Sequence, residues 1–226
     1  MLTFEQFVTT RGAAKALELS TALASGQTDA PRLLLLHGPP GVGKTHLLHS
    51  IAHDVNIRRP SIPVVQTSAV ELIEEMTARL HRDRTSDLQP RWAPNAVVTI
   101  DDLHILTDRI ATQREVGRVV RTALERGARL ACAAGCPLSA IATLIGALRE
   151  VVGARLVRLY RPGSTDIRRI LREMARVEGL SLRAKALASM AAQCRGDVRR
   201  AASAITRQRF EAARRDPVAA AAPPAG

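Results

Sequence analysis

The chain reads Gly38-Pro39-Pro40-Gly41-Val42-Gly43-Lys44-Thr45 directly after four leucines and a histidine. These eight residues match G-x-x-x-x-G-K-[ST], a loop in which glycines let backbone N–H groups point inward at phosphate oxygens. An apolar strand before the loop and a helix after it are the context that the pattern requires. The sequence therefore predicts a nucleotide-phosphate site, with Lys44 at the β and γ phosphates and the Thr45 hydroxyl on Mg²⁺.

Short apolar runs alternate with amphipathic segments over about the first 160 residues. The runs predict strands at 33–36, 63–67, 96–100, 130–133 and 156–159. Helical periodicity predicts helices at 45–54, 69–81 and 114–126. Strands that alternate with helices at this spacing form a parallel sheet covered by helices on both faces, so the predicted fold class is α/β.

The strand pattern ends at Pro162. Segments 165–178, 182–194 and 198–214 predict three helices, with Gly179 and Gly196 where helix ends favour a left-handed residue. We therefore expect an α/β core over residues 1–162 and a small all-α domain over residues 163–215. Residues 216–226, rich in Ala and Pro, are expected to form a disordered tail.

A second motif, Val97-Val98-Thr99-Ile100-Asp101-Asp102, is an apolar strand that ends in two carboxylates. Alone, such an ending is common as a polar exit from a strand. Downstream of a phosphate loop it matches the Walker B arrangement, in which Asp101 holds the Mg²⁺ shell and Asp102 orients the attacking water. We interpret Asp101 and Asp102 as candidate catalytic residues, and Thr45 and Asp101 as candidate metal ligands.

The charge of the chain is strongly positive and unevenly placed. It has 33 Lys and Arg against 21 Asp and Glu, while 46% hydrophobic residues support a packed core. Residues 149–216 hold 17 basic and 7 acidic side chains, a net charge of +10. A codon bias toward arginine explains an even excess but not this concentration, which favours a polyanion or an acidic partner. The 2% aromatic content argues against a stacking platform for single-stranded bases.

The sequence carries no membrane or secretion signal. No apolar run approaches the roughly 20 residues of a membrane span, and the N-terminus does not read as a signal peptide. Three cysteines are too few for a disulfide framework, so we expect a cytoplasmic protein. The histidines His46, His49 and His53 are interpreted as part of a helix face, and Cys132 and Cys136 as reduced thiols, because neither set has complete zinc-site spacing.

Five segments together resemble the AAA+ domain of the DnaA family, the bacterial replication initiators, over roughly residues 2–214. They are the phosphate loop continuing into His46-Leu47-Leu48-His49, and Leu2-Thr3-Phe4-Glu5-Gln6-Phe7-Val8, Leu72-Ile73-Glu74-Glu75-Met76, Ile100-Asp101-Asp102-Leu103-His104 and Gly196-Asp197-Val198-Arg199.

This resemblance implies an AAA+ P-loop NTPase, an αβα core with a small helical lid, that binds ATP or ADP with Mg²⁺. Residues 38–45 and His46 would contact the nucleotide, Phe7 and Val8 would lie near the adenine, and Arg199 of the sensor II segment would reach the phosphates. It also implies control of chromosomal replication initiation through contacts with a DnaA-type initiator or another AAA+ protein, and self-assembly is a further expectation.

The sequence departs from the DnaA family in three ways. It shows no origin-reading helix-turn-helix domain, which makes it similar to Hda-type regulators, but the clamp-binding Gln-and-Leu motif of that group is missing before Phe4. The sensor I stretch reads Cys132-Ala133-Ala134-Gly135, with only a thiol for hydrogen bonding. At the position of the arginine finger the alignment places Val151, with Arg149 and Arg155 as nearby alternatives.

These observations favour a DnaA-related, ATP-binding regulator of replication initiation whose intrinsic hydrolysis is weak and whose basic lid binds DNA without sequence preference. An alternative is an active AAA+ ATPase, such as a helicase loader or transposition accessory protein, in which another group replaces the sensor I side chain. A third hypothesis, a small-molecule phosphotransferase, is disfavoured by the Asp101-Asp102 pair and the lid arginine Arg199.

Overall fold

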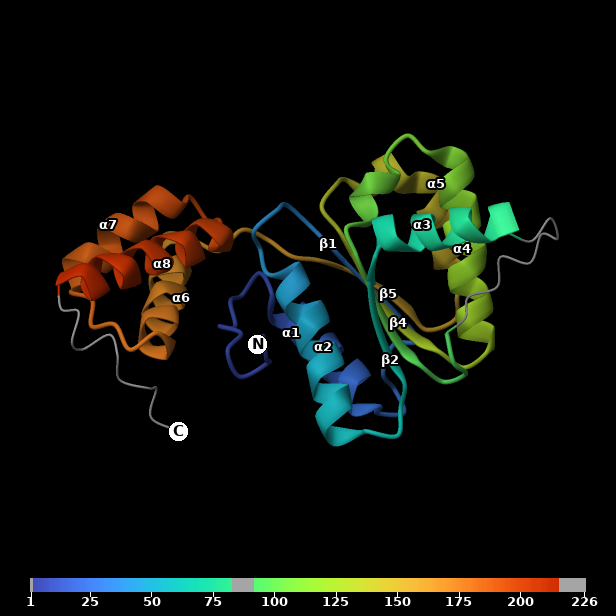
Figure 1. Ribbon diagram of the computed structural model, residues 1–226, viewed down its shortest axis with the longest axis horizontal. Helices are drawn as coiled ribbons and strands as arrows, with labels where there is room; N and C mark the ends of the chain where they lie inside the picture. The colour runs from blue at the N-terminus through green and yellow to red at the C-terminus, as the bar shows by residue number, and fades with distance from the viewer. Residues whose placement is uncertain (1, 83–91, 216–226) are drawn as a thin grey trace. The chain divides into compact units, whose positions relative to one another are not determined.

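The computed structural model describes residues 2–82 and 92–215. The chain divides into two compact units, the first ending at Tyr160 and the second beginning at Arg161 (Figure 1). This division lies two residues before the expected domain boundary. The tail predicted over residues 216–226 lies outside the described residues.

The first unit is built on a five-stranded sheet in the order β2-β3-β4-β1-β5, with every pair parallel. The strands are β1 (Leu33–His37), β2 (Val64–Ser68), β3 (Val97–Asp101), β4 (Arg129–Ala134) and β5 (Ala154–Arg158). Each starts and ends within two residues of its predicted position, and the α/β fold class is confirmed. The order places β4 between the strand that precedes the phosphate loop and the strand that ends in Asp101.

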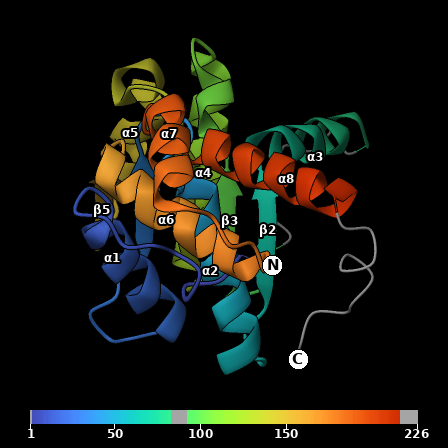
Figure 2. The ribbon, with the colours of Figure 1, turned by 90° about the vertical axis from the view of Figure 1, so that its left-hand side faces the viewer.

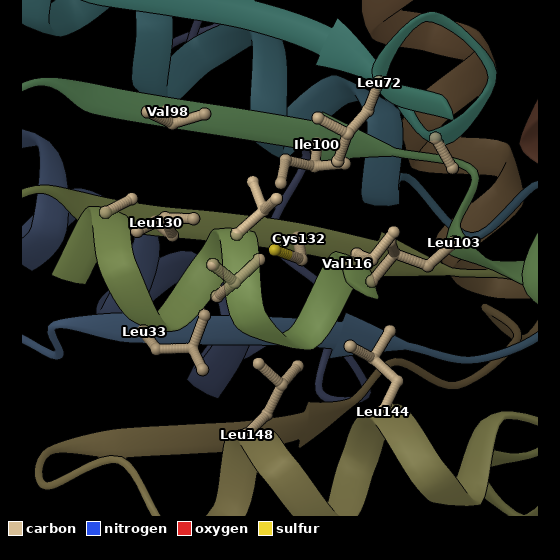
Figure 3. Close-up of a cluster of buried hydrophobic side chains, with 14 of the residues drawn as sticks. Leu33, Leu72, Val98, Ile100, Leu103, Val116, Leu130, Cys132, Leu144 and Leu148 are labelled. Atoms are coloured by element: carbon tan, nitrogen blue, oxygen red, sulfur yellow. The ribbon is translucent and has the colours of Figure 1, made fainter. Parts of the chain in front are cut away.

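Helices cover both faces of this sheet (Figure 1). One face is covered by α1 (Ala14–Ser25) and α2 (Lys44–Arg58). The other face is covered by the helices α3 (Ala69–Arg82), α4 (Ile110–Glu125) and α5 (Ala142–Arg149). The 3₁₀ turns η1 (Leu103–Leu106) and η2 (Leu138–Ile141) lie on this second face as well. Leu34 and Leu36 belong to the cluster beneath α1 and α2. Leu33, with Leu130 and Cys132 of β4, belongs to the other cluster (Figure 3). Burial on both faces is why the strands read as unbroken apolar runs.

Two helices of this unit were not predicted from the sequence, α1 and α5. The buried face of α1 consists of Ala16, Ser20, Leu23 and Ala24, which are mostly small residues. These residues recur at helical spacing, but the buried face is only slightly more hydrophobic than the exposed face, so the helix is hard to recognise in the sequence. Small residues let α1 pack closely against α2. α5 has only eight residues, too few for its periodicity to stand out from the surrounding sequence.

The second unit contains three helices that contact one another, α6 (Ser164–Val177), α7 (Ala184–Cys194) and α8 (Val198–Arg215), as the sequence predicts (Figure 2). Its buried side chains include Ile167, Leu171, Leu187 and Ile205. Within the described part of the chain, no helix is both long and apolar enough to cross a membrane.

Candidate nucleotide site

The phosphate loop follows β1 and has the backbone conformation that its glycines permit. Gly38 has φ 146° and Gly43 has φ 101°, in the region that favours glycine. A Cβ at Gly38 would collide with the carbonyl oxygen of Leu159, and one at Gly43 would come within 2.9 Å of the Phe7 ring. Glycine is therefore required at both positions, because the backbone has positive φ and because Leu159 and Phe7 leave no room for a Cβ atom.

Lys44 is the first residue of α2, and its ammonium group is held inside the loop. Its Nζ donates to the carbonyl oxygens of Gly38 at 2.8 Å and Pro39 at 2.9 Å, and the residue is 7% exposed. The loop also lies at the N-terminus of a 15-residue helix, where unpaired N–H groups and the helix dipole favour an anion. This arrangement presents positive charge to a phosphate group.

Thr45 and Asp101 are 56 positions apart in the sequence and hydrogen-bonded in the structure. The Thr45 Oγ1 donates to Asp101 Oδ2 at 2.7 Å, and Asp101 Oδ1 accepts the backbone N–H of Asp102 at 2.7 Å. A hydroxyl and a carboxylate are oxygen donors of the kind that Mg²⁺ prefers, and this ion commonly uses only one or two protein ligands beside phosphate oxygens. The residues present therefore fit Mg²⁺, which Thr45 and Asp101 would hold.

The other candidate metal patterns do not converge. Among the side chains that the structure describes, no group of three or more His, Cys, Asp or Glu is arranged to hold a metal ion. Cys132, Cys136 and Cys194 are free thiols.

The N-terminal segment packs against the start of α2. The ring of Phe7 meets the imidazole of His46 edge-on, with ring centroids 5.2 Å apart, and His46 Nε2 lies 2.8 Å from the carbonyl oxygen of Thr3. Since a carbonyl oxygen can only accept, Nε2 carries the proton in this tautomer. Val8 follows as a partly buried residue. The structure thus brings Phe7 and His46 beside the phosphate loop, and Val8 is the next residue of the chain after Phe7.

Two histidines at this site have a lowered pKa. Burial lowers the pKa of His46, and burial with the positive charges of Arg158 and Lys44 lowers the pKa of His37. Because the unfolded chain binds protons more readily than the folded chain, the free energy of unfolding should fall as pH drops below about 6.5, the ordinary histidine value.

His46→Gln should reduce this pH dependence, because glutamine can still donate to the Thr3 carbonyl but does not titrate. The measurement is urea unfolding at about pH 7.5 and about pH 5.5. The exposed His49→Gln is the matched control and should keep most of the pH dependence, because the charge of His49 is the smallest of the causes that act on the pKa of His46. An unchanged pH dependence in the His46 variant would contradict the assignment.

The sensor I stretch at the end of β4 offers little polarity. The Cys132 thiol points into the apolar cluster (Figure 3), and burial together with the charge of Asp101 raises its pKa to about 12. It therefore stays protonated and acts as a small apolar side chain. Ala133 and Ala134 complete the strand end.

The segment expected to carry an arginine finger lies between α5 and β5. Val151 is partly buried against the core, while Arg149 and Arg155 are exposed. Arg155 pairs in register with Leu34 near the start of β1, so this segment lies toward the amino ends of the strands. The phosphate loop follows the carboxyl end of β1, and this segment therefore lies at the opposite edge of the sheet from the chain's own nucleotide site.

Arg199 belongs to the second unit, in the first turn of α8. Asp197 caps that helix, because its Oδ1 accepts the Arg199 N–H at 2.8 Å. Gly196 has φ 75°, and a Cβ there would approach the Pro162 carbonyl oxygen to 2.9 Å. The Gly-Asp pair thus presents an exposed Arg199 at a helix N-terminus.

Sequence reasoning assigned no role to two charged or polar side chains at the carboxyl edge of the sheet. Arg158 pairs in register with His37 at the carboxyl end of β5. His104 of η1 lies close to Asp102 and Gly135. The position of Arg158 beside His37 depends on the order of the strands, which cannot be predicted from the sequence. His104 belongs to the segment from Ile100 to His104, but the sequence does not indicate which side chain it contacts.

A parallel sheet with a phosphate loop after β1 and an Asp-Asp pair after β3 defines an AAA+ P-loop NTPase fold. The model of the bacterial DnaA ATPase domain matches residues 1–157. The chain therefore belongs to the bacterial DnaA ATPase domain family.

Solved structures share this fold. The chain is 19% identical to domain III of the Thermotoga maritima replication initiation protein DnaA, with a TM-score of 0.83 over 95% of this chain and 90% of that chain. A replication initiator DnaA bound to AMPPCP and single-stranded DNA gives 21% identity and a TM-score of 0.76 over 95% and 67%. The Thermotoga maritima RuvB Holliday junction branch migration motor gives 20% and 0.60 over 93% and 65%.

Proposed function

We propose that this chain binds ATP or ADP with Mg²⁺ and regulates replication initiation through AAA+ contacts with a DnaA-type initiator or another AAA+ protein. The observation that carries the nucleotide part is the 2.7 Å hydrogen bond from Thr45 to Asp101, because it joins the two motifs at the place where Mg²⁺ would bridge them to a nucleotide. The regulatory part is supported by membership of the bacterial DnaA ATPase domain family.

Intrinsic hydrolysis is proposed to be weak. The strand end beside the phosphate loop has an inert thiol and two alanines where a polar side chain would help to place the attacking water. Loss of one group that stabilises the transition state typically costs about 10²-fold or more in rate. The alternative, an active helicase loader or transposition accessory ATPase, requires turnover typical of such machines.

A multiple-turnover ATPase assay with and without purified initiator separates these candidates. A regulator should bind ATP, turn it over slowly alone and change the behaviour of the initiator when the two are mixed. Fast turnover in isolation would favour the motor-type alternative, and failure to bind ATP would reject both.

The helical lid is proposed to bind DNA without sequence preference. α8 carries the exposed residues Arg200 and Arg207, two turns apart, and both line a hollow of about 360 Å³ with Gln193 and Ser203. Phosphate contacts carry no sequence information, so unrelated duplexes should bind equally and binding should weaken steeply with salt.

Replacing Arg200 and Arg207 together by alanine should lower the magnitude of the slope of log affinity against log salt by about two, one for each phosphate contact. The matched control removes Arg176 and Arg209, which belong to the same unit but pair with Glu173 at 2.6 Å and Glu178 at 2.9 Å. Fluorescence anisotropy over a salt series measures both. Equal slopes in the two double variants, or a marked sequence preference, would contradict the proposal.

A further inference from the structure

We infer that His104 takes the place of the missing sensor I side chain and, with Asp102, positions the water that attacks the γ-phosphate. The inference rests on the proposed nucleotide function and names the group on which the remaining turnover depends. His104 is a positioning residue in this account, because it acts on the water and on Asp102.

The strand order brings the end of β4 to the phosphate loop. The backbone N–H of Gly38 donates to the carbonyl oxygen of Ala134 at 3.3 Å, and His37 pairs in register with Ala134. On the other side of β4, Cys132 pairs with Ile100 of β3. Ile100 directly precedes Asp101 in the chain. A polar group placed over the end of β4 therefore lies between the phosphate loop and the two carboxylates.

The imidazole of His104 occupies that position. A Cβ built on Gly135, the residue after β4, would lie 3.4 Å from His104 Nδ1 and 3.6 Å from Cγ, which is van der Waals contact. Residue 135 thus has no side chain where the strand ends, and the ring from η1 covers it instead. The side chains of the two alanines before it contain no polar atom.

His104 also faces Asp102 and has a fixed backbone. Its Nδ1 lies 3.6 Å from Asp102 Oδ1, longer than a hydrogen bond, and catalytic hydrogen bonds often shorten only when substrate is bound. The left-handed conformation of Asp102, φ 59°, turns the chain from β3 into η1. The His104 carbonyl oxygen accepts two hydrogen bonds from Thr107, from its hydroxyl at 2.7 Å and its N–H at 3.1 Å, while Leu103 and Leu106 are buried on either side.

This geometry assigns complementary roles to the two side chains. With Nδ1–H directed at the Asp102 carboxylate, Nε2 keeps a lone pair that can accept a hydrogen bond from the attacking water. The water oxygen then bonds to the γ-phosphorus, the bond to the β–γ bridging oxygen breaks, and ADP leaves with that electron pair. The proton released by the water passes to the phosphate product, so His104 orients the water and is unchanged by the reaction.

The test uses the full chain and the substitutions His104→Ala and His104→Gln; the side-chain carbonyl oxygen of glutamine can still accept a hydrogen bond from the water in place of Nε2. His104→Ala should lower single-turnover ATP hydrolysis roughly 10- to 100-fold, the loss typical of a supporting hydrogen-bond partner, with unchanged affinity for AMPPCP. His104→Gln should recover part of the rate. His49→Ala, on the exposed side of α2, is the matched control and should behave as the unmodified chain.

A second variant and a second readout guard against a purely structural effect. In the His104→Ala background, Gly135→Ser should restore part of the rate, because the hydroxyl would enter the space left by the ring. Formation of the ADP–aluminium fluoride complex should follow the same order as the rates, while thermal unfolding should not. If His104→Ala hydrolyses ATP and forms that complex as well as the unmodified chain does, the inference is wrong. If the unmodified chain does neither yet binds AMPPCP, the inference fails while the nucleotide site stands.

Discussion

Replacing Lys44 by alanine should lower the affinity for ATP by about 10²-fold or more. The ammonium group is buried and held by two loop carbonyls, so it is positioned before any phosphate arrives. Hydrogen bonds to charged groups contribute about 1.5–3 kcal/mol each, and each 1.4 kcal/mol corresponds to tenfold in affinity, so the loss of two bonds to phosphate oxygens accounts for this change.

Isothermal titration with ATP and Mg²⁺ measures the effect of this substitution. Lys15→Ala is the matched control, because Lys15 is an exposed lysine on α1 whose partner is Glu18 at 2.6 Å. Urea unfolding without nucleotide checks that the Lys44 variant is folded. Binding within threefold of the unmodified chain by a folded Lys44 variant would contradict the site.

The second large effect concerns a mixed assembly with a DnaA-type initiator. An arginine finger supplied by a neighbour accelerates hydrolysis by about 10³-fold or more. Val151 carries no charge and packs partly against the core, so this chain should leave the ATPase of the initiator unstimulated. The initiator is loaded with labelled ATP, this chain is added in its ADP form, and release of labelled phosphate is followed.

An arginine introduced at position 151 tests the role of the missing finger charge directly. Val151→Arg should produce strong stimulation, because the segment lies at the opposite edge of the sheet from the chain's own phosphate loop and is available to a neighbour's site. Strong stimulation by the unmodified chain would overturn the assignment. Arg149→Ala and Arg155→Ala, two exposed positions nearby, would then identify the arginine that serves as the finger.

The fold class, the strand positions and the two motifs could all be predicted from the sequence. Each of these signals is local: a strand buried on both faces is an apolar run, and the glycine spacing and Lys44 specify the phosphate loop. α1 was missed because a stripe of alanine and serine buries little apolar surface. α5 was missed because a helix of two turns has almost no periodicity.

The contacts between residues that are distant in the sequence could not be predicted and are seen only in the folded chain. Strand order cannot be read from local periodicity, yet it places β4 between β1 and β3 and brings Thr45 within 2.7 Å of Asp101. In the sequence, the Cys132 to Gly135 stretch shows only that a polar side chain is missing. The fold brings His104, from another segment, over Gly135, because the left-handed turn at Asp102 directs η1 back across the strand end. The polarity of this site therefore depends on which segments pack together in the fold. The sequence alone does not specify these contacts.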